Sequence, residues 1–118
     1  MYSPELLDHF EHPRHAGELA DATASARVEN PACGDVLELS VKVVDHRIDD
    51  IRFRAKGCVP AMACASAISE LAKGRSIEDA RAIQRDDVVS AVGGLPPASG
   101  HAAQLAIDAL CGVLTAVK

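Results

Sequence analysis

The stretch that decides the fold is residues 36–56, VLELSVKVVDHRIDDIRFRAK. Apolar and polar side chains alternate along residues 36–44 and again along residues 51–55, which is typical of strands with one buried face. A short polar break at residues 45–47 separates the two runs, so we expect an antiparallel hairpin. We expect a third strand in the region of Val28.

Helical periodicity replaces this alternation after Gly57. Apolar residues then recur every three or four positions, and Pro60 suits the first turn of a helix. A separate helix should begin near the start of the chain, where Ser3 is a favourable capping residue before Pro4. The predicted helices cover residues 4–12, 60–73, 77–83, 87–92 with Asp86 as cap, and 101–117, while residues 14–27 are predicted as a loop. This order predicts an α+β fold, a small antiparallel three-stranded sheet with helices packed on one face.

Length and composition limit the class of protein. The chain has 118 residues, of which 48% are hydrophobic and 25% charged, so we expect a single globular domain over residues 1–118. The net charge of -5 argues against nucleic acid as a partner. No apolar run is long enough to span a membrane, and the first residues do not resemble a signal peptide. We therefore expect a cytoplasmic protein whose four cysteines are thiols or metal ligands rather than disulfides.

Four residues in three loops could bind a metal together. Cys33 and Asp35 precede the long strand, Cys58 lies between a strand and a helix, and His101 opens the last helix. Two thiolates, a carboxylate and an imidazole can form a four-coordinate site for zinc or an iron–sulfur cluster. The spacing matches no zinc-finger or thioredoxin motif. The alternative is that the cysteines are core or turn residues and that His101 is an ordinary surface histidine.

The remaining cysteines and histidines are weaker candidates. Cys64 falls on the apolar stripe of its predicted helix, so packing is its expected role. Cys111 shares a helical face with polar residues, which predicts a partly exposed thiol. The other histidines are not accompanied by further metal-binding residue types; they are His9, His12, His15 and His46.

Several motifs together give the chain a family resemblance. They are YS at residues 2–3, DHFEHPRHAG at 8–17, NPACGD at 30–35, FRAKGC at 53–58, AMACAS at 61–66, KGRS at 73–76 and LPP at 95–97. With these motifs in this order, nearly the whole sequence resembles the iron–sulfur cluster assembly scaffolds of the IscU, NifU N-terminal and SufU type.

The resemblance implies a function and a set of ligands. The protein would be a scaffold or carrier, not an enzyme, that binds iron, a cluster or zinc and passes a cluster to apo iron–sulfur acceptor proteins. Its metal ligands would be Cys33, Asp35, Cys58 and His101, and its cluster is expected to be of the [2Fe–2S] type. A cysteine desulfurase would be its sulfur-donating partner. A cluster with two thiolates per chain could also be bridged between two copies, giving a homodimer.

The chain departs from the family pattern at two places. Ala102 stands where the family has its third cysteine, and Cys64 is the candidate substitute ligand or sulfur acceptor. Residues 95–99 lack the lysine of the family's chaperone-recognition stretch, which makes an interaction with that chaperone doubtful. Two alternatives therefore stay open. One is an interaction or regulatory protein that binds a desulfurase without building a cluster, and the other is a sulfur-transfer protein that accepts a persulfide on Cys58 or Cys64.

Overall fold

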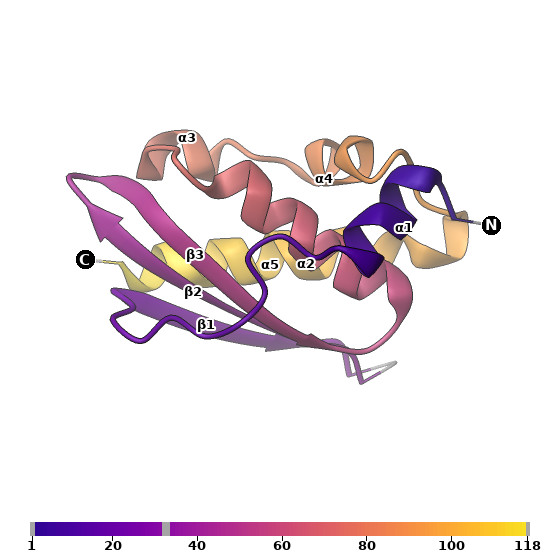
Figure 1. Cartoon of the computed structure of the whole chain (residues 1–118), viewed down its shortest axis with the longest axis horizontal. Coiled ribbons are helices and arrows are strands. Elements are labelled where there is room, and N and C mark those ends of the chain that lie inside the picture. The colour runs from indigo at the N-terminus through magenta and orange to yellow at the C-terminus, as the bar shows by residue number, and fades with distance from the viewer. Residues whose placement is uncertain (1, 32–33, 118) are drawn as a thin grey trace.

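The structure, a computed structural model, describes residues 2–31 and 34–117. A three-stranded sheet occupies the first half of the chain, and most of the helical residues follow it (Figure 1). The elements are α1 (Pro4–Glu11), β1 (Ala24–Glu29), β2 (Val36–Val44), β3 (Arg47–Lys56), α2 (Val59–Ala72), α3 (Ile77–Arg81), α4 (Arg85–Ala91), a 3-10 turn (Pro97–Ser99) and α5 (Gly100–Ala116). The α+β prediction is confirmed.

The sheet is antiparallel throughout, in the order β1-β2-β3. The central strand pairs Leu39 with Ala26 on one side and with Phe53 on the other. Residues of β2 alternate between fully buried and half-buried positions, because one face of the sheet carries the helices. The predicted hairpin is therefore confirmed, with its second strand beginning at Arg47.

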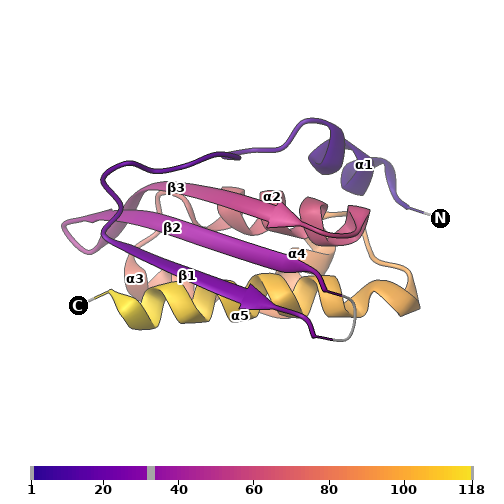
Figure 2. The same cartoon turned by 90° about the horizontal axis from the view of Figure 1, so that it is seen from below.

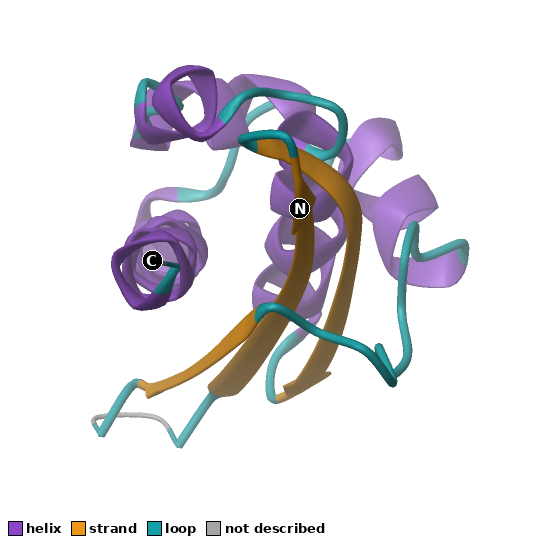
Figure 3. Ribbon diagram, turned by 90° about the vertical axis from the view of Figure 1, so that its left-hand side faces the viewer, coloured by secondary structure: helices purple, strands orange, loops and turns teal. Residues whose placement is uncertain are grey.

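The two long helices cover the same face of the sheet (Figure 2). Helix α2 packs against β3, α5 packs against β1 and β2, and the two helices contact each other. Figure 3 shows the twisted sheet along the long axis of the molecule, with α5 on one side of it; α5 contacts β1, and α1 contacts α2. The largest buried side chains come from both layers: Leu6, Leu37, Leu39, Ile48, Ile51, Ile68 and Leu114. No helix within residues 2–31 and 34–117 combines the length and apolarity needed to cross a bilayer.

The prediction of a loop over residues 14–27 is wrong at its end, because β1 already begins at Ala24. The hydrophobicity pattern does not reveal the first residues of this strand, because two of its inward side chains are the alanines Ala24 and Ala26. Close helix packing explains the small size: a Cβ atom added to Gly112 of α5 would lie 3.3 Å from the Cβ of Ala26. A larger residue at either position would push α5 away from the sheet.

The cap of α4 also differs from its prediction. Gln84, not Asp86, precedes the helix. The backbone N–H of Gln84 donates to the carboxylate of Asp87 at 2.8 Å, which ties the first turn together. Asp86 is the second residue of α4 and is exposed. The sequence has two adjacent acidic residues here, and only the residue at which the helix begins determines which of them stabilises the first turn.

Candidate metal centre

Three separate segments bring a carboxylate, a thiol and an imidazole together at one end of the sheet. Asp35 lies immediately before β2, Cys58 is the residue before the first turn of α2, and His101 is in the first turn of α5. One ligand atom from each residue lies within 4.8 Å of the ligand atoms of the other two. The sheet and the two helices that pack on it thus position the three groups as one cluster.

Asp35 is the centre of this cluster. Its Oδ1 accepts the backbone N–H of Cys58 at 3.1 Å, and its Oδ2 lies 3.1 Å from Cys58 Sγ. His101 Nε2 lies 3.5 Å from the same Oδ2 and 4.0 Å from Cys58 Sγ. The Asp35 side chain is only 4% exposed, whereas the His101 side chain is 35% exposed, so the cluster opens to solvent on the histidine side.

The distances suit a bound metal ion. In a tetrahedral site with ligand bonds of 2.0–2.3 Å, neighbouring ligand atoms lie about 3.3–3.8 Å apart. The three distances among Asp35, Cys58 and His101 span 3.1–4.0 Å, so a single ion fits between them with small side-chain adjustments. Thiolate, imidazole and carboxylate together form a donor set that zinc or cluster iron accepts.

Gly57 makes the close approach of Asp35 and Cys58 sterically feasible. Its φ of +152° is a conformation that residues with a Cβ rarely adopt. A Cβ atom at this position would lie 2.2 Å from Oδ1 and 2.6 Å from Cγ of Asp35. The carboxylate therefore occupies the space that any other residue at position 57 would fill.

The fourth predicted ligand, Cys33, lies outside the described residues. Of the four predicted ligands, the structure brings the other three together. Cys64 is fully buried, and burial together with the nearby Cys58 raises the pKa of its thiol to about 12. A thiol that is buried and protonated suits a packing role, as its position on the apolar stripe predicts. Cys111 is exposed on α5, also as predicted.

Ala102 follows His101 and is 1% exposed, with its methyl group among the core residues. This is the position at which the family resemblance leads one to expect a third thiol. Within the described residues, no other cysteine, histidine or acid joins the group formed by Asp35, Cys58 and His101.

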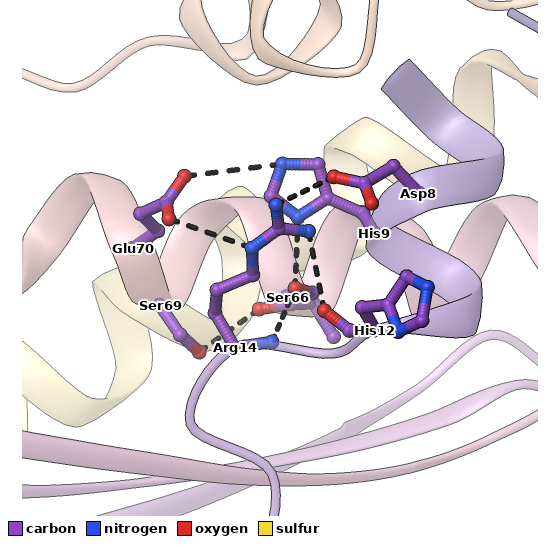
Figure 4. A network of polar contacts seen from close by, with 8 residues as sticks. Asp8, His9, His12, Arg14, Ser66, Ser69 and Glu70 are labelled. Carbon is purple, nitrogen blue, oxygen red and sulfur yellow. Dashed lines mark hydrogen bonds and ion pairs between the residues drawn. The ribbon is translucent and has the colours of Figure 1, made fainter. Parts of the chain in front are cut away.

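A second polar cluster, which the sequence analysis did not identify, lies between α1 and α2 (Figure 4). Buried His9 Nδ1 and buried Ser66 Oγ are 2.8 Å apart, and Ser66 Oγ also accepts the backbone N–H of Arg14 at 2.8 Å. Glu70 lies 3.9 Å from His9 Nε2 and 3.6 Å from Arg14 Nε. Burial lowers the pKa of His9. Because Ser66 is enclosed, this cluster holds α1 and the following segment against α2 rather than presenting a reactive hydroxyl.

This cluster has a signal in the sequence, but only in combination. His9 and Arg14 lie in the motif at residues 8–17, and Ser66 lies in the motif at residues 61–66, 52 residues after Arg14. Helical spacing places Ser66 and Glu70 on one side of α2, one turn apart. Which residue of the N-terminal segment meets that side depends on how α1 docks, and local periodicity carries no information on docking.

Comparison with known proteins gives a consistent result. The NifU-like N-terminal domain family matches residues 1–117. The scaffold protein IscU 1 of Archaeoglobus fulgidus is 47% identical over 93% of this chain and 72% of its own length. IscU of Escherichia coli K12 is 38% identical over 99% of this chain and 94% of its own length. Both relatives are named iron–sulfur cluster assembly scaffold proteins.

A solved structure has the same fold. A SUF-system scaffold protein from Fervidobacterium islandicum superposes with a TM-score of 0.81 over 96% of both chains at 18% identity. At this identity the likeness concerns the fold alone. The family match over residues 1–117 includes the segments that form the candidate centre. This chain belongs to the NifU-like N-terminal domain family.

Proposed function

We propose that this protein is an iron–sulfur cluster assembly scaffold, which holds a nascent cluster at Asp35, Cys58 and His101 together with Cys33 and passes it on. The observation that carries the proposal is the convergence of the three described ligands from three segments onto one point. The names of the relatives, which are scaffold proteins, support the same function.

Each ligand has a distinct role in this proposal. The thiolates of Cys33 and Cys58 are the soft ligands that hold cluster iron most firmly. His101 supplies a nitrogen ligand, as imidazoles do on one iron of Rieske centres. The carboxylate of Asp35 is the weakest of these ligands for cluster iron, so it is the one that exchanges when the cargo leaves. The exposed histidine side of the centre is the route by which a cluster reaches an acceptor.

The cargo and the partners follow from this chemistry. We propose a [2Fe–2S] cluster as the assembled species, and zinc as an ion that the same ligands hold when no cluster is present. Sulfur would come from a cysteine desulfurase, and the cluster would go to apo iron–sulfur proteins. Cys64 is fully buried, which favours Cys58 over Cys64 as the thiol that meets incoming sulfur or iron.

Anaerobic reconstitution with ferric iron and sulfide tests the proposal, because two ferric ions and two sulfides give a [2Fe–2S] cluster without a further oxidant. The natural protein should develop the visible absorption of a protein-bound cluster and transfer that cluster to an apo-ferredoxin. Cys58→Ser should abolish both signals, because a hydroxyl is a poor ligand for cluster iron. The matched control is Cys111→Ser, which removes an exposed thiol on the other long helix and should leave both signals intact.

Two results would overturn this function. A natural protein that forms no cluster, although it is folded and reduced, would show that the centre does not assemble one. A cluster that forms equally well in Cys58→Ser would place the ligands elsewhere in the chain.

A further inference from the structure

The two edge strands of the sheet differ in whether another segment of the chain hydrogen-bonds to their outer side. The outer edge of β3 is covered: Phe53 exchanges backbone hydrogen bonds with residues 15 and 17, and residues 46–48 bond to residues 74–77. The outer edge of β1 has no such cover, because within residues 2–31 and 34–117 no segment pairs with it. An open edge of this kind can pair with another strand.

The hydrogen-bond pattern shows which residues of β1 face that edge. The register continues beyond the strand, and the N–H of Asn30 donates to the carbonyl of Asp35 at 2.8 Å. In an antiparallel pair, every second residue bonds to the same neighbour. The even-numbered residues of β1 therefore bond to β2, and the backbone N–H and C=O groups of Ser25, Arg27 and Glu29 point away from it.

The exposed side chains on this edge carry opposite charges. Arg27 and Glu29 are both exposed on the helix-free face of the sheet, two residues apart. Charged side chains on an edge strand usually oppose association. Opposite charges at this spacing instead favour one self-pairing register, because opposite charges directly across a strand pair are favourable and like charges are unfavourable.

The registers of an antiparallel self-pairing can be compared directly. A two-fold axis at Arg27 would place Arg27 against Arg27 of the second copy, which is repulsive. An axis at Ala26 would place Arg27 against Ser25. An axis at Val28 places Arg27 against Glu29 of the second copy. The two-fold symmetry also places Glu29 against Arg27 of the second copy, so there are two such pairs. The half-buried Val28 side chains then meet on the helix-covered face.

We propose that this protein forms a weak homodimer in which the β1 strands of two copies pair antiparallel about Val28, joining two sheets into one of six strands. The dimer is weak because the paired segment is short. The two copies of Glu29, at which β1 ends, lie on opposite sides of the two-fold axis, so each copy keeps its own centre. This assembly therefore differs from a dimer bridged by a shared cluster, and it forms in metal-free protein.

Charge exchange on the strand tests the pairing. The metal-free protein is analysed by sedimentation velocity from micromolar to millimolar concentration, at low and high salt. Arg27→Glu and Glu29→Arg should each weaken the dimer by about tenfold or more, since each replaces two attractive pairs with two repulsive ones. The double variant Arg27→Glu/Glu29→Arg should restore association. Asp86→Arg on exposed α4 is the control for the change in net charge and should have no effect.

Amide hydrogen exchange gives a second readout that a different dimer surface would not produce. At high concentration, the amides of Arg27 and Glu29 should gain protection, because their N–H groups become hydrogen-bonded across the new pair. Circular dichroism verifies that each variant is folded. A chain that stays monomeric at millimolar concentration overturns the proposal. So does association that single charge reversals leave unchanged, or that the double reversal fails to restore.

Discussion

Replacing Gly57 with alanine should damage the fold and the centre together. The added Cβ atom would lie 2.2 Å from Oδ1 of Asp35, well inside contact distance, so the carboxylate has to move. Moving it breaks the hydrogen bond from the Cys58 N–H, which measures 3.1 Å. The backbone also has to hold a φ of +152° with a side chain present.

The expected loss in the free energy of unfolding follows from the backbone strain and from the broken hydrogen bond. Alanine in such a backbone conformation costs about 1–3 kcal/mol. Losing a hydrogen bond to a carboxylate costs about 1.5–3 kcal/mol. We therefore expect Gly57→Ala to lower the free energy of unfolding by about 3–5 kcal/mol and to weaken zinc binding by about 10- to 100-fold, since Asp35 leaves its place. Urea unfolding and competition against a zinc chelator measure the two quantities.

Gly17→Ala is the matched control. Gly17 has a φ of +132°, similarly restricted to glycine, but a Cβ atom there would meet nothing within 4 Å. Gly17→Ala should therefore lower the free energy of unfolding only through backbone strain, by about 1–3 kcal/mol, and should leave zinc binding unchanged. In an Asp35→Ala background the cost of Gly57→Ala should fall toward that value. Equal destabilisation by both glycine substitutions, with zinc binding intact in both, would refute the steric argument.

Further predictions concern the carboxylate, the buried histidine and the buried cysteine. Asp35→Ala should lengthen the lifetime of a reconstituted cluster against a chelator, measured by decay of its visible absorption, because the exchangeable ligand is gone; equal or faster decay would contradict this role. Burial lowers the pKa of His9 from its ordinary 6.5, so the folded state disfavours the protonated ring. The free energy of unfolding should therefore be greatest above pH 6.5 and fall below it, and His9→Gln should reduce the difference between urea unfolding at about pH 8 and about pH 5.5. Cys64→Ala should cost about 1–2 kcal/mol in packing without changing zinc affinity, and loss of zinc binding would make Cys64 a ligand.

Local sequence patterns account for most of the secondary structure. The alternation along residues 36–44 predicts β2 with its observed bounds, and Ser3 caps α1 as predicted, accepting the N–H of Leu6 at 2.9 Å. The beginning of β1 could not be predicted because Ala24 and Ala26 are small. The small size of Ala26 is required by the approach of Gly112 from α5, a contact between residues far apart in the sequence.

The candidate centre was predictable in its members and not in its geometry. Residue type and loop position indicate Asp35, Cys58 and His101, and the family resemblance supplies the same set. The contact of Gly57 with the Asp35 carboxylate depends on how the end of β3 meets the start of β2, which no local pattern encodes. The hydrogen bond from the Cys58 N–H to that carboxylate has the same origin.

X-ray absorption spectroscopy of the zinc-loaded protein tests the ligand set most directly. With Cys33, Cys58, Asp35 and His101 as ligands, one zinc ion should have two sulfur neighbours at about 2.3 Å and two nitrogen or oxygen neighbours at about 2.0–2.2 Å. Cys58→Ser should remove one sulfur neighbour, and Cys111→Ser should remove none. A spectrum without sulfur neighbours, or one that Cys58→Ser leaves unchanged, would contradict the proposal that this cluster of residues is the metal centre.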